Sequence, residues 1–234
     1  MNISLLVLVA VAGYLIGSIS FARIVGNIVA PEEDLSHTSI AIAGSDLKFE
    51  SNTVSATAIS ARRGPAFGLS VALLDMLKAA APVWFLQLRF PDQPLVFLLL
   101  AIMVVVGHNY PIYHRFHGGR GLSPIMGAYF MLDWISILIT MIISSVLGFA
   151  VVKKYFLGYA GWLYLMIPAF FFRFEQPIYG IYAAAIAIIF TIASVSEFDQ
   201  FRKLESADID PMNTDFEGFE NWNIQKMIDR LRGK

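Results

Sequence analysis

The residues best suited to chemistry lie in one segment rich in glycine and basic side chains, Gly107–Leu122, which reads GHNYPIYHRFHGGRGL. Gly118, Gly119 and Gly121 surround Arg120. Glycine lets the backbone approach a ligand closely, so that several N–H groups can point at one oxyanion beside a guanidinium and a helix N-terminus. The segment therefore predicts a phosphate-binding loop. A tight turn at the membrane surface, with the arginine bound to lipid headgroups, is the alternative.

Two charged residues, Asp75 and Lys78, lie in the middle of an apolar stretch. Spaced i,i+3 on a helix, they share a face and can pair. Charges deep in a membrane span are costly and commonly mark a functional site, whereas a structural ion pair or a lysine that reaches the surface is the alternative. His108 ends the next apolar stretch. It is suited to orienting a substrate or relaying a proton, or simply to a hydrogen bond at the helix end.

The elements that must position these residues are membrane-spanning helices. Apolar residues make up 57% of the 234 positions, charged residues 15%, and the mean hydropathy is +0.63. Six apolar stretches approach the roughly 20 residues that cross a bilayer, namely Asn2–Gly26, Ala66–Leu88, Pro94–Tyr113, Gly121–Val152, Tyr155–Phe174 and Pro177–Val195. The fourth is too long for one crossing, and a break at Asp133–Trp134 divides it into Leu122–Leu132 and Ile135–Val152. We predict an all-α polytopic transmembrane bundle of about seven helices, the fourth short or re-entrant.

Basic residues in the loops predict the orientation of this bundle. With the N-terminus outside, the other side of the membrane collects nine of them: Lys48, Arg62, Arg63, Arg115, Arg120, Lys153, Lys154, Arg202 and Lys203. The outer side holds only Arg89 and Arg173. We therefore place loops 27–65 and 114–121 in the cytoplasm, beside a cell membrane. Residues 1–196 form the transmembrane domain, and residues 197–234 form a cytoplasmic tail.

The end of the tail, Trp222–Arg232, is basic and amphipathic. This pattern suits a helix on the membrane surface or one packed on its own protein.

Several functions find no support in the sequence. A net charge of −1 favours no nucleic-acid partner. The absence of cysteine excludes disulfides, thiolate metal sites and a cysteine nucleophile. His114 and His117 have no acidic neighbour, so we predict no metal and no cofactor. Neither a G-x-S-x-G elbow nor a Walker pattern occurs, which disfavours hydrolases and nucleotide-binding proteins.

Three segments together resemble the bacterial acyl-phosphate:glycerol-3-phosphate acyltransferases. Gly13–Phe21, GYLIGSISF, is similar to the opening span G-Y-L-x-G-S-I-P-F of that family, and Asp75–Ala79 to its D-x-L-K-G element. Gly107–Leu122 matches its motif G-H-x-[FY]-P-x-[FY]-x-x-F-K-G-G-K-G-[VL], with His117 and Arg120 in place of lysines. The resemblance covers roughly residues 10–205 and includes the seven-helix pattern.

Two further motifs of the family are altered here. Glu50–Ala58 stands where the family has G-S-G-N-x-G-A-T-N, and it keeps Ser51, Ala56 and Thr57. The arginine that follows this motif in the family is absent at position 61, and Arg62 comes one place later. These differences remove amide and guanidinium donors from a presumed phosphate site.

The remaining motifs are similarly reduced. Thr140–Ser144 stands where the family has T-R-x-V-S, without its arginine. Glu197–Leu204 stands where the family has H-R-x-N-I-x-R-L, and only Lys203 and Leu204 keep the pattern.

The resemblance implies an enzyme of phospholipid synthesis that needs no cofactor. The sn-1 hydroxyl of glycerol-3-phosphate would attack the carbonyl of an acyl-phosphate, giving lysophosphatidate. The implied catalytic residues are Arg120, Lys78 and Arg62. The implied substrate-binding residues are Ser51, Thr53, Thr57, His108, His117, Gly118, Gly119, Gly121, Ser144 and Lys203.

Two other functions remain open at this point. A non-catalytic or substrate-shifted homologue, which binds lipid or assembles with partners, is favoured by the altered motifs. A small-solute transporter would explain Asp75 and Lys78 but not the loop of glycine and basic residues.

Overall fold

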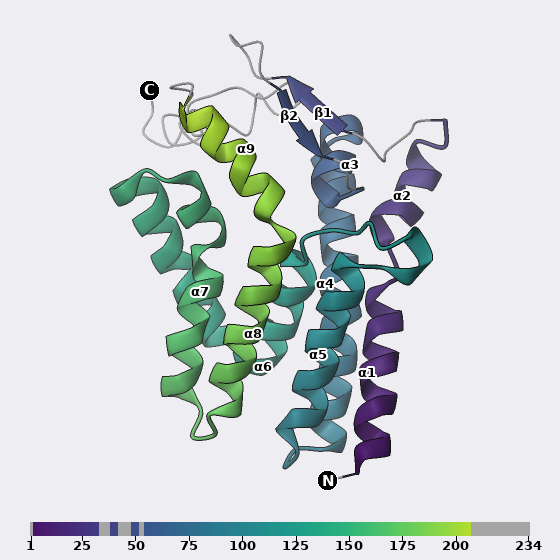
Figure 1. Ribbon diagram of the computed structural model, residues 1–234, viewed down its shortest axis with the longest axis vertical. Coiled ribbons are helices and arrows are strands. Elements are labelled where there is room, and N and C mark those ends of the chain that lie inside the picture. Colours follow the sequence, from purple (N-terminus) through teal and green to yellow (C-terminus); the bar gives the residue numbers. More distant parts are fainter. Residues whose placement is uncertain (1, 33–37, 42–47, 52–53, 207–234) are drawn as a thin grey trace. The chain divides into compact units, whose positions relative to one another are not determined.

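A computed structural model describes residues 2–32, 38–41, 48–51 and 54–206 (Figure 1). The predicted tail helix Trp222–Arg232 and the candidate residue Thr53 lie outside the described residues. The chain divides into two compact units, Met1–Phe21 with Ser70–Ala193, and Ala22–Leu69 with Ser194–Lys234. The predicted functional boundary at residue 196 stays a prediction.

The first unit is helical in its described part. It contains α1 (Ile3–Gly17), most of α4 (Pro65–Arg89), α5 (Pro94–Asn109), α6 (Leu122–Ser145), α7 (Tyr155–Arg173) and α8 (Ile178–Ala193). A 3-10 turn, η1 (Ile112–His114), follows α5, and a π-helix, η2 (Val146–Val152), follows α6. The prediction of an all-α bundle is therefore confirmed for this unit.

The second unit contains shorter elements: α2 (Phe21–Val29), α3 (Ala56–Arg63), α9 (Val195–Ser206) and two strands. The strands, β1 (Thr38–Ala41) and β2 (Lys48–Ser51), pair antiparallel with Ile40 opposite Phe49. This hairpin was not predicted. Each strand is only four residues long and shows no extended alternation, so the sequence signal for a strand is weak there.

Among the described residues, five helical stretches are long and apolar enough to cross a membrane: Ile3–Val29, Pro65–Arg89, Pro94–His114, Leu122–Val152 and Tyr155–Arg173. A sixth passes the same test if Ile178–Ala193 and Val195–Lys203 form one span. These stretches correspond to the six predicted apolar segments. The number of crossings and the orientation of the termini stay predictions.

The predicted break near Asp133 is confirmed. Asp133 has φ −159° and ψ 90°, which interrupts α6. Its Oδ1 accepts hydrogen bonds from Ile135 N and Ser136 N, both at 3.2 Å, and its Oδ2 accepts one from Ser136 Oγ at 2.7 Å. Asp133 thus caps a new helix segment, because its carboxylate satisfies backbone donors that have no partner within the helix.

The segment after the break runs antiparallel to α7. Asp133 lies 3.4 Å from Arg173 at the end of α7, and Thr140 Oγ1 contacts Met166 Sδ at 3.3 Å. Ser144 Oγ reaches Leu157 O, near the start of α7, at 2.6 Å. Residue numbers rise along α6 as they fall along α7, so the two segments form a helical hairpin.

Glycines bring the backbones of α1 and α5 close together. A Cβ at Gly13 would lie 2.9 Å from Leu100 O, while one at Gly17 would collide with Val104 O and one at Gly107 with Tyr14 O. Small residues spaced four apart allow this kind of close helix contact in membranes. The packing holds the end of α1 against the end of α5, which carries His108.

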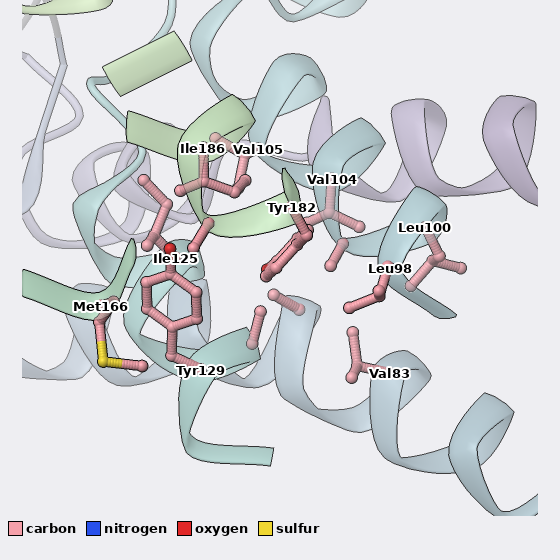
Figure 2. Close-up of a cluster of buried hydrophobic side chains, with 14 of the residues drawn as sticks. Val83, Leu98, Leu100, Val104, Val105, Ile125, Tyr129, Met166, Tyr182 and Ile186 are labelled. Atoms are coloured by element: carbon pink, nitrogen blue, oxygen red, sulfur yellow. The ribbon is translucent and has the colours of Figure 1, made fainter. Parts of the chain in front are cut away.

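The core of the first unit lies between α4, α5, α6, α7 and α8 (Figure 2). Tyr129 is at its centre and makes edge-on ring contacts with Trp162, Phe170 and Tyr182 at centroid separations of 6.1, 5.3 and 5.7 Å. Edge-on arrangements suit the charge distribution of aromatic rings and add to the free energy of burial. This aromatic core gives the helices that carry the site a fixed frame.

Candidate active site

The buried cluster of the first unit is built around the ammonium group of Lys78. Lys78 Nζ donates hydrogen bonds to Gly17 O at 3.1 Å and to Ile19 O at 2.8 Å, and it lies within hydrogen-bond distance of His108 Nδ1, at 2.9 Å. Asp75 Oδ1 lies 2.7 Å from the same nitrogen, as the predicted i,i+3 ion pair. The two side chains are 3% and 5% exposed, so Lys78 does not reach the surface of the protein.

The acceptors for Lys78 exist because α1 ends where it does. The last carbonyls of a helix have no partner within it, and they carry the negative end of the helix dipole. Gly17 ends α1, and Ile19 lies in the break before α2. Ser18 strengthens this turn by donating its hydroxyl to Tyr14 O at 2.8 Å. A buried cation is thus neutralised by one carboxylate and by backbone carbonyls.

The segment Gly118–Gly121, called the glycine loop below, packs on the end of α5. Gly119 N donates to His108 O at 3.1 Å. A Cβ at Gly118 would collide with His108 O, and one at Gly119 would collide with His108 Nε2. Gly121 adopts φ +87°, in the region that favours glycine, and a Cβ there would lie 2.7 Å from Asn109 Oδ1. Close packing on α5 is therefore a sufficient structural reason for all three glycines.

The chain also turns sharply just before the glycine loop. Arg115 and Phe116 have φ values of 52° and 61°, and His117 Nδ1 lies 2.7 Å from Arg115 O. Residues other than glycine rarely adopt this left-handed backbone conformation, which costs free energy and is often found near functional sites. Arg120 is half-buried, whereas His117 is exposed. Lys78, His108 and the glycine loop, all predicted site residues, are thus brought together in one unit.

The other predicted site residues belong to the second unit. Ser51 ends β2, Thr57 and Arg62 lie on α3, and Lys203 lies on α9. Ser55 caps α3 by accepting a hydrogen bond from Ala58 N at 3.2 Å. Thr57 and Lys203 are exposed and Arg62 is half-buried. The roles given to these residues stay predictions.

Comparison with known proteins points to the same family as the motifs. Residues 7–203 match the sequence profile of a family described as glycerol-3-phosphate acyltransferase. The chain belongs to this family. The resemblance inferred from the motifs is therefore confirmed over most of the chain.

Relatives of known sequence support the assignment to the glycerol-3-phosphate acyltransferase family. Glycerol-3-phosphate acyltransferase 2 of Thermotoga maritima is 34% identical over 125 residues, which cover 53% of this chain and 57% of that protein. A glycerol-3-phosphate acyltransferase of Oceanobacillus iheyensis is 31% identical over 135 residues, 55% of this chain and 59% of that protein. The match thus spans less than two thirds of the length of these curated relatives.

The fold is also similar to solved structures. Crystal structures of PlsY (YgiH), described as an integral membrane glycerol 3-phosphate acyltransferase, have been solved in a lysphosphatidic acid form and a glycerol 3-phosphate form. Each is similar with a TM-score of 0.65 at 22% identity, over 85% of this chain and 92% of PlsY. Together with the apolar helices, this fold makes the chain a multi-pass membrane protein.

Ser144, a candidate substrate-binding residue from the motifs, makes a hydrogen bond within the protein. Ser144 is buried, and its hydroxyl donates to Leu157 O between α6 and α7. A Cβ at Gly161 would lie 2.7 Å from Ser144 Oγ. The hydroxyl therefore joins two helices, and its predicted contact with substrate stays untested.

Two features of this chain were not foreseen. The first is the pair of carbonyls, at Gly17 and Ile19, that accept from Lys78; the spacing Gly13–Gly17 was the available signal, since it predicts close helix packing. The second is Asn109, which is 3% exposed and whose amide atoms have no hydrogen-bond partner among the described residues. Its place beside His108 in the motif was the signal available for it.

Proposed function

We propose that this chain transfers an acyl group from acyl-phosphate to the sn-1 hydroxyl of glycerol-3-phosphate, giving lysophosphatidate and inorganic phosphate. The observation that carries the proposal is the family match over residues 7–203, which includes the whole segment Gly107–Leu122. The packing of the glycine loop on His108 supports the proposal, because it places this loop and the buried Lys78 at the same end of α5.

The reaction needs no covalent enzyme intermediate, since acyl-phosphate is already activated. The hydroxyl oxygen attacks the carbonyl carbon, the bond from that carbon to the phosphate oxygen breaks, and the phosphate leaves with the hydroxyl proton. Catalysis then rests on positioning and on electrostatic stabilisation of the phosphate and of the carbonyl oxygen. Arg120, with Gly118, Gly119 and Gly121, would hold one phosphate.

A second phosphate site is assigned to the second unit. Ser51, Thr53, Thr57 and Arg62 would hold it, with Lys203 as an additional cation. Hydroxyl and guanidinium groups are suited to phosphate oxygens, and arginine is the stronger partner because its hydrogen bonds are charge-assisted. Arg62 lies in the last turn of α3, a helix capped by Ser55, which gives the residue a defined backbone position.

The orientation that suits this activity has the N-terminus outside and the glycine loop on the cytoplasmic side of the cell membrane. Glycerol-3-phosphate would enter from the cytoplasm, while the acyl chain lies among the membrane lipids. The distribution of Lys and Arg over the loops supports this orientation.

A second candidate function is supported by one observation. Glu197, at the start of the third motif, is a buried carboxylate where the family has histidine. The family's imidazole is thus replaced by a carboxylate, which when ionised only accepts hydrogen bonds and so cannot donate one to a phosphate. A homologue that binds lipid without turnover, or that acts on another substrate, would retain the helices and the glycine loop with this change.

The test is turnover by purified protein in lipid, with labelled glycerol-3-phosphate and with palmitoyl-phosphate, palmitoyl-CoA or an acyl carrier as donor. We expect lysophosphatidate from palmitoyl-phosphate. Arg120→Ala should lower turnover about 100-fold, the usual cost of losing a charge-stabilising donor. Arg89→Ala, which removes the same charge from a predicted external turn, is the matched control. No product from any donor with folded protein would favour the non-catalytic homologue.

A further inference from the structure

We propose that Lys78 is a positioning residue that holds His108 as a neutral ring with its proton on Nε2. The Nε2–H group then becomes a fixed hydrogen-bond donor beside the glycine loop. That its acceptor is a phosphate-bearing substrate rests on the proposed function; the protonation of the ring does not.

The first step counts the donors of Lys78. A lysine ammonium has three N–H groups and no lone pair. Its three hydrogen bonds go to Gly17 O, Ile19 O and His108 Nδ1. At 2.9 Å, His108 Nδ1 can only accept, because two N–H groups facing each other at that separation would repel. The ring proton of a neutral His108 must therefore be on Nε2.

The second step is that Lys78 carries the charge. A neutral lysine amine could accept a hydrogen bond from His108, but it would turn a lone pair toward its other neighbours. Those neighbours are two carbonyl oxygens and the carboxylate of Asp75, whose Oδ1 lies 2.7 Å from Nζ. The two carbonyl oxygens stabilise the ammonium form by accepting its hydrogen bonds, and the Asp75 carboxylate stabilises it by its charge. The negative end of α1 acts in the same direction.

The third step concerns the other side of the ring. His108 Nε2 faces Gly119, where any Cβ would collide with it. Among the described residues no hydrogen bond to Nε2 is present, and the His108 side chain keeps 15% of its surface exposed. The backbone N–H of Gly119 already donates a hydrogen bond to His108 O. The ring thus adds a donor to a loop whose own N–H at this position is engaged.

These contacts separate the roles of two residues. Lys78 is 3% exposed and gives all three hydrogen bonds to protein atoms, so it acts on a ligand only through His108. His108 can touch an anion at the glycine loop. A neutral N–H donor strengthens the binding of a phosphate oxygen without adding a second buried cation.

Nuclear magnetic resonance of ¹⁵N-histidine-labelled protein in lipid tests the ring directly. The chain has four histidines, and the signal lost in His108→Gln assigns the relevant one. At neutral pH we expect an unprotonated Nδ1 and a protonated Nε2. A proton on Nδ1, alone or with one on Nε2, would overturn the proposal even if the enzyme turns over acyl-phosphate.

Removing Lys78 tests the cause. In Lys78→Met, the Asp75 carboxylate remains near His108 Nδ1, from which its Oδ1 lies 3.6 Å away, and we expect the proton to appear on Nδ1. The double variant Asp75→Asn with Lys78→Met removes both buried charges and guards against simple misfolding. Loss of the fixed Nε2–H form in either folded variant supports the proposal. An unchanged ring in the folded double variant overturns it.

Conservative replacements of His108 test the donor. A glutamine amide reaches about as far as Nε2, whereas an asparagine amide reaches only about as far as Nδ1. We expect His108→Gln to keep kcat/KM for glycerol-3-phosphate within about 10-fold and His108→Asn to lose about 100-fold. Equal losses would overturn the donor role. Inorganic phosphate should also shift the Nε2–H signal of unmodified protein, and no shift would likewise overturn that role, with no turnover needed.

Discussion

Two ion pairs of the first unit, Asp75–Lys78 and Asp133–Arg173, differ in what surrounds them. Asp75 and Lys78 are 5% and 3% exposed, and Lys78 is bonded to backbone carbonyls and to His108. Asp133 is also 5% exposed, but its partner Arg173 is 60% exposed, and its carboxylate is already satisfied by the backbone of its own helix. The difference teaches that burial of an acid alone does not mark a site. What distinguishes the first pair is a buried cation that lies next to His108, the residue that we propose contacts a ligand.

The largest effect is expected from a substitution that breaks the first pair, Asp75–Lys78. Lys78→Met leaves Asp75 as an uncompensated buried charge, and removing one partner of a buried pair typically costs about 3–5 kcal/mol. We expect a large drop in the thermal midpoint measured in detergent. The double variant Asp75→Asn with Lys78→Met should recover most of this loss, since both charges are gone. A double variant as unstable as the single one would show that the charges are not the cause.

The next effect acts on the acceptors of Lys78. Gly17→Val places side-chain atoms where Gly17 meets Val104 O, so α1 and α5 must move apart. Overpacking of this kind costs about 1–3 kcal/mol, and turnover should fall because the carbonyl of Gly17 moves away from Lys78. Ile16→Val, a change on the same turn away from the glycine contacts, is the control. Thermal midpoint and turnover are measured together, and unchanged turnover in folded Gly17→Val would contradict the link.

The apolar helical spans of this chain could be predicted well because each depends on a local pattern. Apolar stretches of sufficient length predicted the spans, and Asp133 in the middle of the longest stretch predicted its break. The Asp75–Lys78 pair followed from helical spacing alone. The β1–β2 hairpin was missed, since two strands of four residues in a polar loop carry little pattern.

The site was harder to predict because its key partners are backbone atoms. Carbonyl groups have no side-chain identity, so the acceptors at Gly17 and Ile19 could not be recognised from residue types. The glycines of the loop were predicted as ligand-binding, and the structure adds their contacts with His108 and Asn109. Ser144 was selected as part of a motif, yet its hydroxyl is used between two helices.

A substitution in the second pair, at Asp133, is expected to have an effect of intermediate size. Asp133→Ala removes the acceptor of Ile135 N and Ser136 N, and loss of such a cap costs about 0.5–2 kcal/mol. Asp133→Asn keeps one acceptor oxygen and loses the charge that faces Arg173. We therefore expect the asparagine variant to lie closer to the unmodified protein in thermal midpoint, with turnover retained by both. Equal destabilisation would mean that the charge, not the cap, is what Asp133 contributes.

The smallest expected effect comes from the exposed cation. Arg173→Gln removes the charge from a side chain that is 60% exposed, and pairs of this kind contribute roughly 0–1 kcal/mol. Asp133 keeps its three hydrogen bonds within the helix, so it is not left unsatisfied when the arginine is lost. We expect the thermal midpoint and turnover to stay close to those of the unmodified protein. A loss as large as that of Lys78→Met would show that the arginine is needed to compensate Asp133, and the two pairs would then be equivalent despite their difference in exposure.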